Sequence, residues 1–148
     1  MSNSKALEIR NAVVASLQAA TAVAELIRVG RRVALPESRS EGVYVYLDYS
    51  AIERGQLQHV PDDWKTRVRV EIAARGVNAV PAEDRADTLM VAVHARVMAD
   101  PSLGGLCVDL YPIGITWDGD EADTTLAVCQ VIFEAVHRVA ADSIAATP

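Results

Sequence analysis

The segment that decides the fold runs from Pro81 to Arg138 and reads PAEDRADTLMVAVHARVMADPSLGGLCVDLYPIGITWDGDEADTTLAVCQVIFEAVHR. It contains a helical pattern, a Gly-Gly break and then two apolar strands around Trp117-Asp118-Gly119-Asp120. The segment has no metal-ligand cluster, no phosphate-binding loop and no nucleophile triad. A well-patterned segment without a catalytic set points towards a protein that acts by assembling with others.

The helix of this segment is expected over Ala82–Ala99. Its apolar residues recur at the helical period, and Pro81 suits the position where a helix begins. Pro101 and Gly104-Gly105 should end it. The stripe that faces the core is predicted to be Ala86, Leu89, Met90, Val93 and Val97.

Two strands should follow this helix. The apolar residues of 106–110 fall in one parity and those of 113–115 in the other, so a bulge or an edge position is expected at Pro112. Asp118-Gly119 is predicted to form a tight hairpin turn. The last strand is expected over Thr124–His137, where β-branched and aromatic residues favour a strand over the alternative, a helix.

The residues before Pro81 add one helix and three strands. The helix is expected over Lys5–Arg28, a short strand over Arg32–Leu35, and longer strands over Val43–Asp48 and Trp64–Ala73. Both longer strands alternate between apolar and polar residues, which is typical of an antiparallel sheet with one buried face. The stretch from Tyr49 to Asp63 fits no element, and connections of this length are often functional.

The element order is therefore α-β-β-β-α-β-β. It predicts an α+β fold with two main helices and a mostly antiparallel sheet of about five strands. The 148 residues suffice for one domain with its own core. We expect a single domain over 1–148, with 1–4 and 140–148 frayed.

Composition limits the classes of function. The chain has 14 Lys and Arg against 20 Asp and Glu, a net charge of -6, which argues against a general nucleic-acid binder. Cys107 and Cys129 lie in apolar runs and are interpreted as reduced core thiols of a cytoplasmic protein rather than as a disulfide. No apolar run reaches the ~20 residues of a membrane span. Ala12–Ala24 is an alternative signal-peptide core, but Gln18 interrupts it.

Residues that could carry chemistry are each better explained by structure. His59, His94 and His137 lie on three different elements and have no ligand spacing. Asp118 and Asp120 flank Gly119 as turn residues, which is favoured over a calcium loop.

Two arginines and two tryptophans have less settled roles. Arg67 and Arg69 could contact phosphates, but Glu71 beside them favours a solvated sheet face or a subunit contact. Trp64 and Trp117 sit at strand ends near turns, where the rim of the core and an interface anchor remain equal alternatives.

The segment resembles the tail terminator proteins of long-tailed bacteriophages, also called tail completion or minor tail proteins. The likeness rests on the helix from Glu83 onward, the break Asp100–Gly105, the strand Val108–Trp117 and the closing strand Gln130–His137. That family usually has a tyrosine in the closing pattern, where this chain has His137. The amino-terminal layout also suits the family, so the resemblance extends over nearly the whole chain.

The resemblance implies a non-enzymatic phage or prophage structural protein that forms a ring, a hexamer in this family. Such a ring caps the tail tube, stops its polymerisation and provides the surface for head joining. The implied partners are copies of itself, the major tail tube protein and the head-tail connector protein. DNA passes through without specific binding, and neither a cofactor, a metal nor a membrane is involved. The implied location is the bacterial host cytoplasm during assembly and then the virion tail.

A ring requires head-to-tail contacts that close by rotation. The surfaces available for such contacts are strand edges, the Tyr49 to Asp63 stretch and the Trp117 turn. The residues that we select as candidate assembly contacts are Tyr49, Arg54, His59, Trp64, Arg67, Arg69, Trp117, Asp118 and Asp120.

Two alternative functions stay open. One is another head-tail joining component, such as a neck or stopper protein. The other is a small α/β enzyme with an active site at a subunit interface, built from Arg67, Arg69, His59 and Asp62. Nothing in the spacing of these four residues favours an active site over solvated surface.

Overall fold

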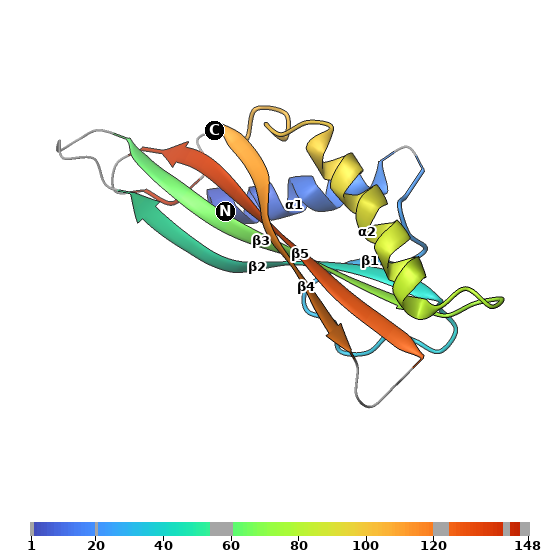
Figure 1. Cartoon of the computed structure of the whole chain (residues 1–148). Coiled ribbons are helices and arrows are strands. Elements are labelled where there is room, and N and C mark those ends of the chain that lie inside the picture. Colours follow the sequence, from blue (N-terminus) through green and yellow to red (C-terminus); the bar gives the residue numbers. More distant parts are fainter. Residues whose placement is uncertain (1, 20, 54–60, 120–124, 141–142, 146–148) are drawn as a thin grey trace.

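β3 (Asp62–Arg75) is the central strand of a five-stranded sheet in the computed structural model, which describes residues 2–19, 21–53, 61–119, 125–140 and 143–145 (Figure 1). The strand order is β1-β2-β3-β5-β4, with β1 parallel to β2 and the other neighbours antiparallel. The remaining strands are β1 (Ile27–Val29), β2 (Glu41–Glu53), β4 (Asp109–Gly119) and β5 (Leu126–Val139). The predicted α+β fold and element order are confirmed.

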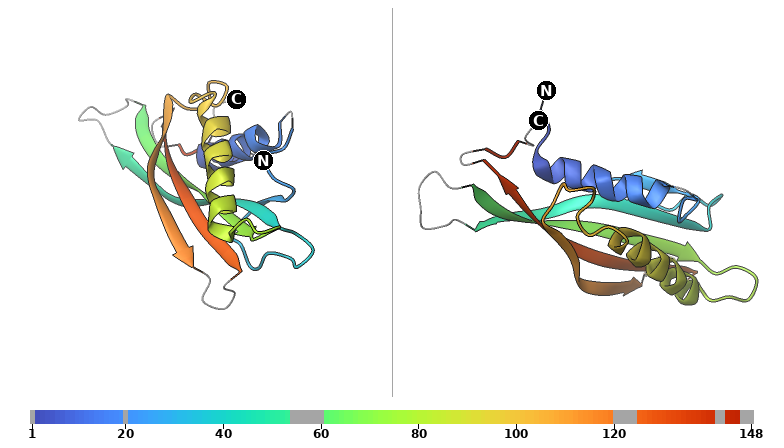
Figure 2. Two further views of the ribbon diagram at one scale, coloured as in Figure 1. Left: turned by 45° about the vertical axis from the view of Figure 1, so that its right-hand side comes forward. Right: turned by 90° about the horizontal axis from the view of Figure 1, so that it is seen from above.

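The two helices, α1 (Lys5–Gln18) and α2 (Ala82–Met98), lie on one side of the sheet (Figures 1 and 2). Because successive strand residues point to opposite faces, every second residue of β3 meets these helices. Fully burying such an aliphatic side chain contributes roughly 1.5–3 kcal/mol. Neither described helix is long and apolar enough to cross a membrane. The predicted inward residues of β3 and four of the five in the α2 stripe are buried, namely Val68, Val70, Ile72, Ala86, Leu89, Val93 and Val97, while Met90 is partly buried against them.

α1 ends at Gln18, so the helix predicted over Lys5–Arg28 was wrong in its second half. Ala19 is already extended, with ψ of 151°. The last carbonyl groups of a helix have no partner within the helix. Arg96 of α2 supplies donors at this end, to the carbonyl oxygens of Ser16 (3.2 Å), Ala19 (2.6 Å) and Thr21 (2.9 Å).

The strands before α2 also differ from the prediction. The short parallel strand is Ile27–Val29, whereas residues 32–35, predicted as a strand, cross the end of the outer sheet face, where Leu35 is buried. β2 and β3 extend through 49–53 and 62–63, so both ends of the unassigned stretch belong to one long hairpin. A bulge between Leu47 and Tyr49 explains the error, because it changes the parity of the alternation at that point. Residues 54–60 lie outside the described residues.

The segment after α2 follows the prediction except at its turn. The register of β4 shifts between Pro112 and Gly114, which confirms the expected bulge. Gly104 and Gly105, predicted to end the helix, lie in the turns after it, because α2 already ends at Met98. Their φ of 70° and 88° is a conformation that glycine adopts without strain. Asp118-Gly119 is not the hairpin turn, because both residues still pair with β5. The closing strand is confirmed and extends to Val139.

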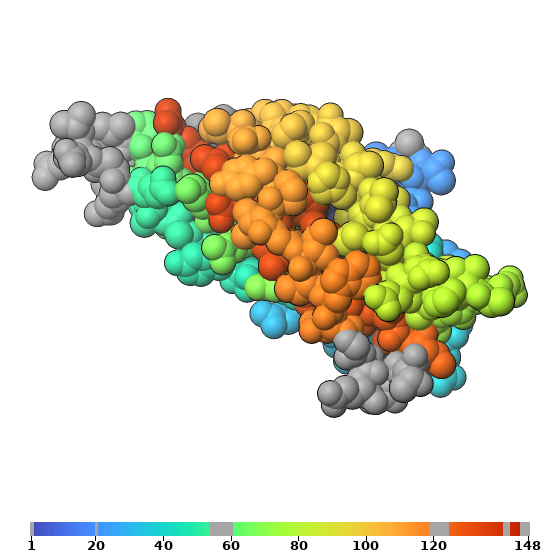
Figure 3. Space-filling model, viewed as in Figure 1, coloured from blue at the N-terminus to red at the C-terminus, as the bar shows by residue number. Residues whose placement is uncertain are grey.

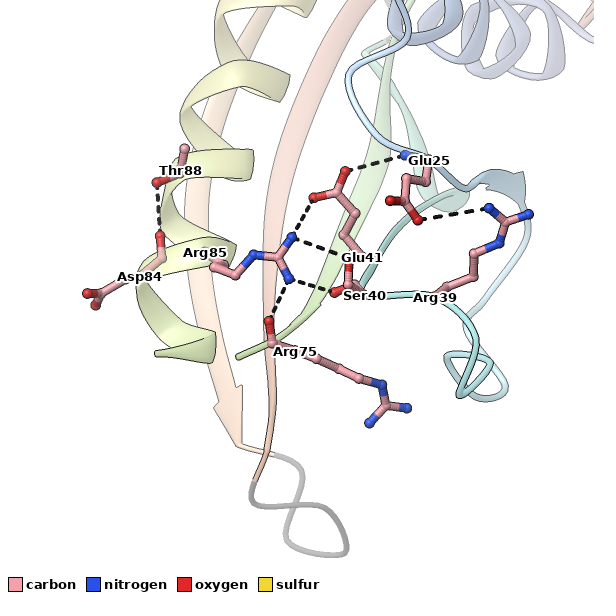
Figure 4. Close-up of polar contacts among 8 residues, drawn as sticks. All are labelled: Glu25, Arg39, Ser40, Glu41, Arg75, Asp84, Arg85 and Thr88. Atoms are coloured by element: carbon pink, nitrogen blue, oxygen red, sulfur yellow. Dashed lines mark hydrogen bonds and ion pairs between the residues drawn. The ribbon is translucent and has the colours of Figure 1, made fainter. Parts of the chain in front are cut away.

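Arg85 joins the start of α2 to the ends of two strands (Figure 4). Its Nη1 donates to the carbonyl oxygen of Arg75 at 2.7 Å, and its Nη2 lies 3.3 Å from Oε2 of Glu41. The guanidinium also reaches the carbonyl oxygen and the hydroxyl of Ser40. Because only 22% of the Arg85 side chain is exposed, these charge-assisted bonds are partly shielded from solvent.

The two ends of the described chain lie side by side. Ser4 forms a β-bridge with Ala145, and the backbone N–H of Lys5 donates to Ile144 at 3.0 Å. The Ser4 hydroxyl accepts from the Leu7 N–H at 3.2 Å and so caps α1. The fraying predicted for 1–4 and 140–148 stays a prediction, because 1, 141–142 and 146–148 lie outside the described residues.

We expect Arg85→Met to lower the free energy of unfolding by about 1–3 kcal/mol, because it leaves partly buried acceptors without donors. The matched control is Arg39→Met, since Arg39 forms a 3.9 Å ion pair with Glu25 in which both side chains are half exposed. That change should cost less than about 0.5 kcal/mol. Urea unfolding measures both values, and equal losses would contradict the role given to Arg85.

Candidate assembly surfaces

The face of the sheet turned away from the helices is rich in tyrosine, arginine and carboxylate side chains. The register places Tyr49, Arg67 and Glu134 in one row across three strands, with Tyr111 of β4 at the end of that row. We call this surface the polar sheet face and define it by Tyr46, Tyr49, Lys65, Arg67, Arg69, Glu71, Tyr111, Gln130, Ile132 and Glu134.

Cross-strand contacts hold the two central arginines of this face in place. Arg69 lies 2.8 Å from Asp48 through Nε and donates to Gln130 at 2.9 Å through Nη1. Arg67 lies 3.4 Å from Glu134, which also accepts a 2.7 Å bond from the Tyr111 hydroxyl. Pairs of opposite charge across a sheet stabilise it. They also fix the side chains before a partner arrives, which lowers the entropy cost of binding.

Two arginines stack on tyrosine rings of the same face. The Arg67 guanidinium lies 5.7 Å from the centre of the Tyr49 ring, and that of Arg31 lies 5.0 Å from Tyr46. Tyr49 remains 56% exposed. The bond that the Tyr111 hydroxyl donates to Glu134, with a smaller effect of burial, raises the pKa of Tyr111. Tyrosine and arginine dominate protein–protein hot spots, so this face has the composition of a contact surface.

Trp117 lies on the edge strand β4, on the same side of the sheet as the helices. It is 45% exposed and lines a hollow of about 380 Å³ together with Pro81, Ala82 and Glu83 at the start of α2. Figure 3 shows β4, in orange, at the surface beside α2. Trp117 is therefore a half-exposed aromatic side chain at a sheet edge, available to a partner.

Trp64 lies on the helix side of the sheet, in the row of Ile52 and His137. Thr66 hydrogen-bonds His137 Nε2 at 2.7 Å and the Ser50 hydroxyl at 2.8 Å. Beside this chain is a largely apolar cavity of about 280 Å³, lined by Ser4, Ala6, Ser50, Trp64, His137, Val139 and Ile144. Burial, with a smaller effect of the Lys5 charge, lowers the pKa of His137 to about 4. His137 is therefore neutral at neutral pH.

The structure brings some of the candidate contacts together and separates others. Tyr49, Arg67 and Arg69 share the polar sheet face, and the register of Asp118 places it on that face as well. Trp64 and Trp117 lie on the opposite face, in rows at its two ends. Three candidates lie outside the described residues, namely Arg54, His59 and Asp120.

The partners of Arg67 and Arg69 and the burial of His137 were not predicted from the sequence. The alternation of the closing strand contained the signal. Gln130 and Glu134 share the parity that faces outward, whereas Phe133 and His137 share the inward parity. Because β5 pairs with β3, this outward parity puts the Glu134 carboxylate beside Arg67 and the Gln130 amide beside Arg69.

The described residues hold no group of three or more His, Cys, Asp or Glu side chains placed to bind a metal ion. Cys107 and Cys129 are buried free thiols, as predicted. Burial raises the pKa of Cys107 to about 11 and that of Cys129 to about 12. Both are therefore protonated at neutral pH and poor nucleophiles.

Comparison with known proteins finds similarity in fold. No protein-family model matches the chain, and neither does any curated protein. The fold is similar to that of a chain in the virion of the native gene transfer agent particle, with a TM-score of 0.57 and 12% identity over 88% of this chain and 95% of that chain. A chain in the sheath/tube terminator of the PVC extracellular contractile injection system, in its extended state, gives a TM-score of 0.46 and 13% identity over 96% of this chain and 60% of that one.

The depressed pKa of His137 predicts a pH dependence of stability. The stability that neutral, buried His137 allows is fully present above pH ~6.5 and is lost as the pH falls towards ~4. The reason is that His137 of the unfolded chain takes up a proton in this range, whereas His137 of the folded chain does not. Between about pH 7.5 and 4.5 the wild type should therefore lose about 1–3 kcal/mol more unfolding free energy than His137→Gln. Urea titrations at the two pH values measure this, and equal losses in both proteins would refute it.

Trp117→Ala should leave the monomer folded and weaken assembly. Because the side chain is half exposed, we expect a loss of less than about 1 kcal/mol in unfolding free energy. Thermal unfolding and sedimentation of the same sample separate the two effects. Loss of cooperative unfolding would instead place Trp117 in the core.

Proposed function

We propose that this chain is a non-enzymatic structural protein of a phage or prophage tail, which caps the tail tube and stops its polymerisation. The observation that carries the proposal is the similarity of its fold to a gene transfer agent virion chain, over nearly the full length of both chains. A fold alone does not determine a function. The surfaces of this chain supply the remaining support.

A protein that joins a tube to a head needs contact surfaces at two opposite ends. The β2–β3 hairpin and the β4–β5 end project from opposite ends of the sheet (Figure 1). Tyr49 and Trp64 lie near the first end, whereas Trp117 and Asp118 lie near the second. We assign one end to the major tail tube protein and the other to the head-tail connector. Arg54 and His59 belong to the first assignment by their sequence positions, and Asp120 to the second.

The polar sheet face suits the passage of DNA without specific binding. The three cations that define this face lie near carboxylates, since Arg67 is near Glu134, Arg69 near Asp48, and Lys65 2.8 Å from Glu53. Tight DNA binding depends on cations that are available to neutralise phosphates. Because the charges of Arg67 and Arg69 are already paired with carboxylates, this surface would bind DNA phosphates weakly.

The same pairing weakens the enzyme alternative. That hypothesis needs Arg67 and Arg69 to hold substrate groups, and both side chains are occupied by protein partners. In our proposal the chain instead assembles with copies of itself into a ring in the host cytoplasm. The ring then becomes part of the virion tail.

The proposal is tested by adding the purified chain to its cognate tail tube protein during polymerisation. Electron microscopy should show tubes that stop growing at lengths set by the ratio of the two proteins. Tyr49→Ala should need roughly fivefold or more protein for the same effect, as expected for a hot-spot residue. Val91→Ala is the matched control, because Val91 is equally exposed but lies on α2.

Tubes that grow past their normal length in the presence of the wild type would overturn the proposal. A neck or stopper protein would give a different result, since it would bind the connector and leave tube length unchanged.

A further inference from the structure

Both edge strands of the sheet carry exposed apolar side chains. The strand order leaves β1 at one edge and β4 at the other. Val29 of β1 is 50% exposed, and Ile115 of β4 is 48% exposed. An uncovered strand edge is a template for pairing with another chain. Apolar residues at such an edge favour occupation by a partner over permanent exposure to water.

The two edges end the same rows of the sheet. The row of Val29 passes through Val45, Val70 and Val131 and ends at Ile115. By the same register, the row of Ile27 ends at Trp117 and the row of Arg28 ends at Thr116. The sidedness also agrees. Val29 and Ile115 lie on the helix side, whereas Arg28 and Thr116 lie on the side of the polar sheet face.

The directions of the edge strands are compatible with pairing. β1 runs parallel to β2, and each later step across the sheet is antiparallel, so β1 and β4 run in opposite directions. A second copy placed beside the first, without sliding along the strands, would set β1 antiparallel to β4. The opposed residues would then be Ile27 and Trp117, Arg28 and Thr116, and Val29 and Ile115.

The charges of the two edges are complementary. Arg28 and Arg31 are exposed at the β1 edge, whereas Asp118 and Glu83 border the Trp117 hollow at the β4 edge. In the unslipped register Arg28 would lie diagonal to Asp118 on the same face. Diagonal neighbours are ~7–8 Å apart, which a long arginine side chain spans.

We propose that the sheet continues from one copy of this chain to the next, with β1 of one copy paired antiparallel to β4 of its neighbour. The contact uses two different patches on each copy, so it closes into a ring when the copies are related by a pure rotation. It rests on the proposed function, because it names the subunit contact of the proposed ring.

Cysteine cross-linking tests the register. In Val29→Cys/Ile115→Cys, the introduced cysteines of neighbouring copies would be directly opposed, at a separation that allows a disulfide. Oxidation should give a ladder of disulfide-linked multimers on a non-reducing gel. Val29→Cys/Val91→Cys is the control, because its cysteines are equally exposed but the second lies on α2. The native Cys107 and Cys129 are buried, so they should not take part in cross-links. Equal ladders, or no ladder in the first variant, would overturn the proposal.

A charge exchange tests the same contact without cysteines. Arg28→Glu alone and Asp118→Arg alone each bring like charges together, which should weaken self-association roughly threefold to tenfold in sedimentation. An equal mixture of the two variants restores opposite charges at both edges and should associate like the wild type. Unchanged association in the single variants, or no recovery in the mixture, would contradict the register. So would a wild type that stays monomeric up to concentrations on the order of 1 mM.

These results separate the contact from the function. A chain that shortens tubes without the Val29–Ile115 cross-link keeps the proposed function and loses this contact. A chain that cross-links but leaves tube length unchanged keeps the contact and loses the proposed function.

Discussion

The alternation of apolar and polar residues along β3 decides which side chains each face of the sheet presents. β3 pairs with β5 along its whole length and with β2 along all but its two end residues, so its pleat fixes which residues of both neighbours share each face. Val68, Val70 and Ile72 point to the helices and are fully buried. The residues between them, Arg67, Arg69 and Glu71, must then point away. Because the helices lie on one side, the other face is left for the polar pairs and for the partners that we propose.

Two bulges adjust this pattern at the proposed contact surfaces. Without the shift between Leu47 and Tyr49, strict alternation would turn Tyr49 towards the helix side and away from Arg67. The shift between Pro112 and Gly114 likewise returns Ile115 and Trp117 to the helix side. Bulges commonly re-aim side chains in this way. In this chain the first bulge places Tyr49 on the polar sheet face, and the second places Trp117 on the helix side.

The sequence was sufficient for the element order, the bounds of α2 and the inward residues of β3, because strong periodicity marks all three. It failed where a residue distant in the chain decides the outcome. Helical propensity continues past Gln18, but Arg96 of α2 binds the carbonyl groups at that helix end. Asp118-Gly119 has the composition of a turn, yet pairing with β5 keeps both residues in the ladder. Arg67 and Arg69 were predicted correctly to face outward, whereas their partners Glu134 and Gln130 on β5 required the register.

The most direct measurement is electron cryomicroscopy of the chain bound to the ends of cognate tail tubes. We predict a closed ring at the tube end, with β1 of each copy beside β4 of the next and one hairpin end of the sheet against the tube. Copies that contact each other through their helices, or density for this chain along the tube wall instead of at its end, would contradict it.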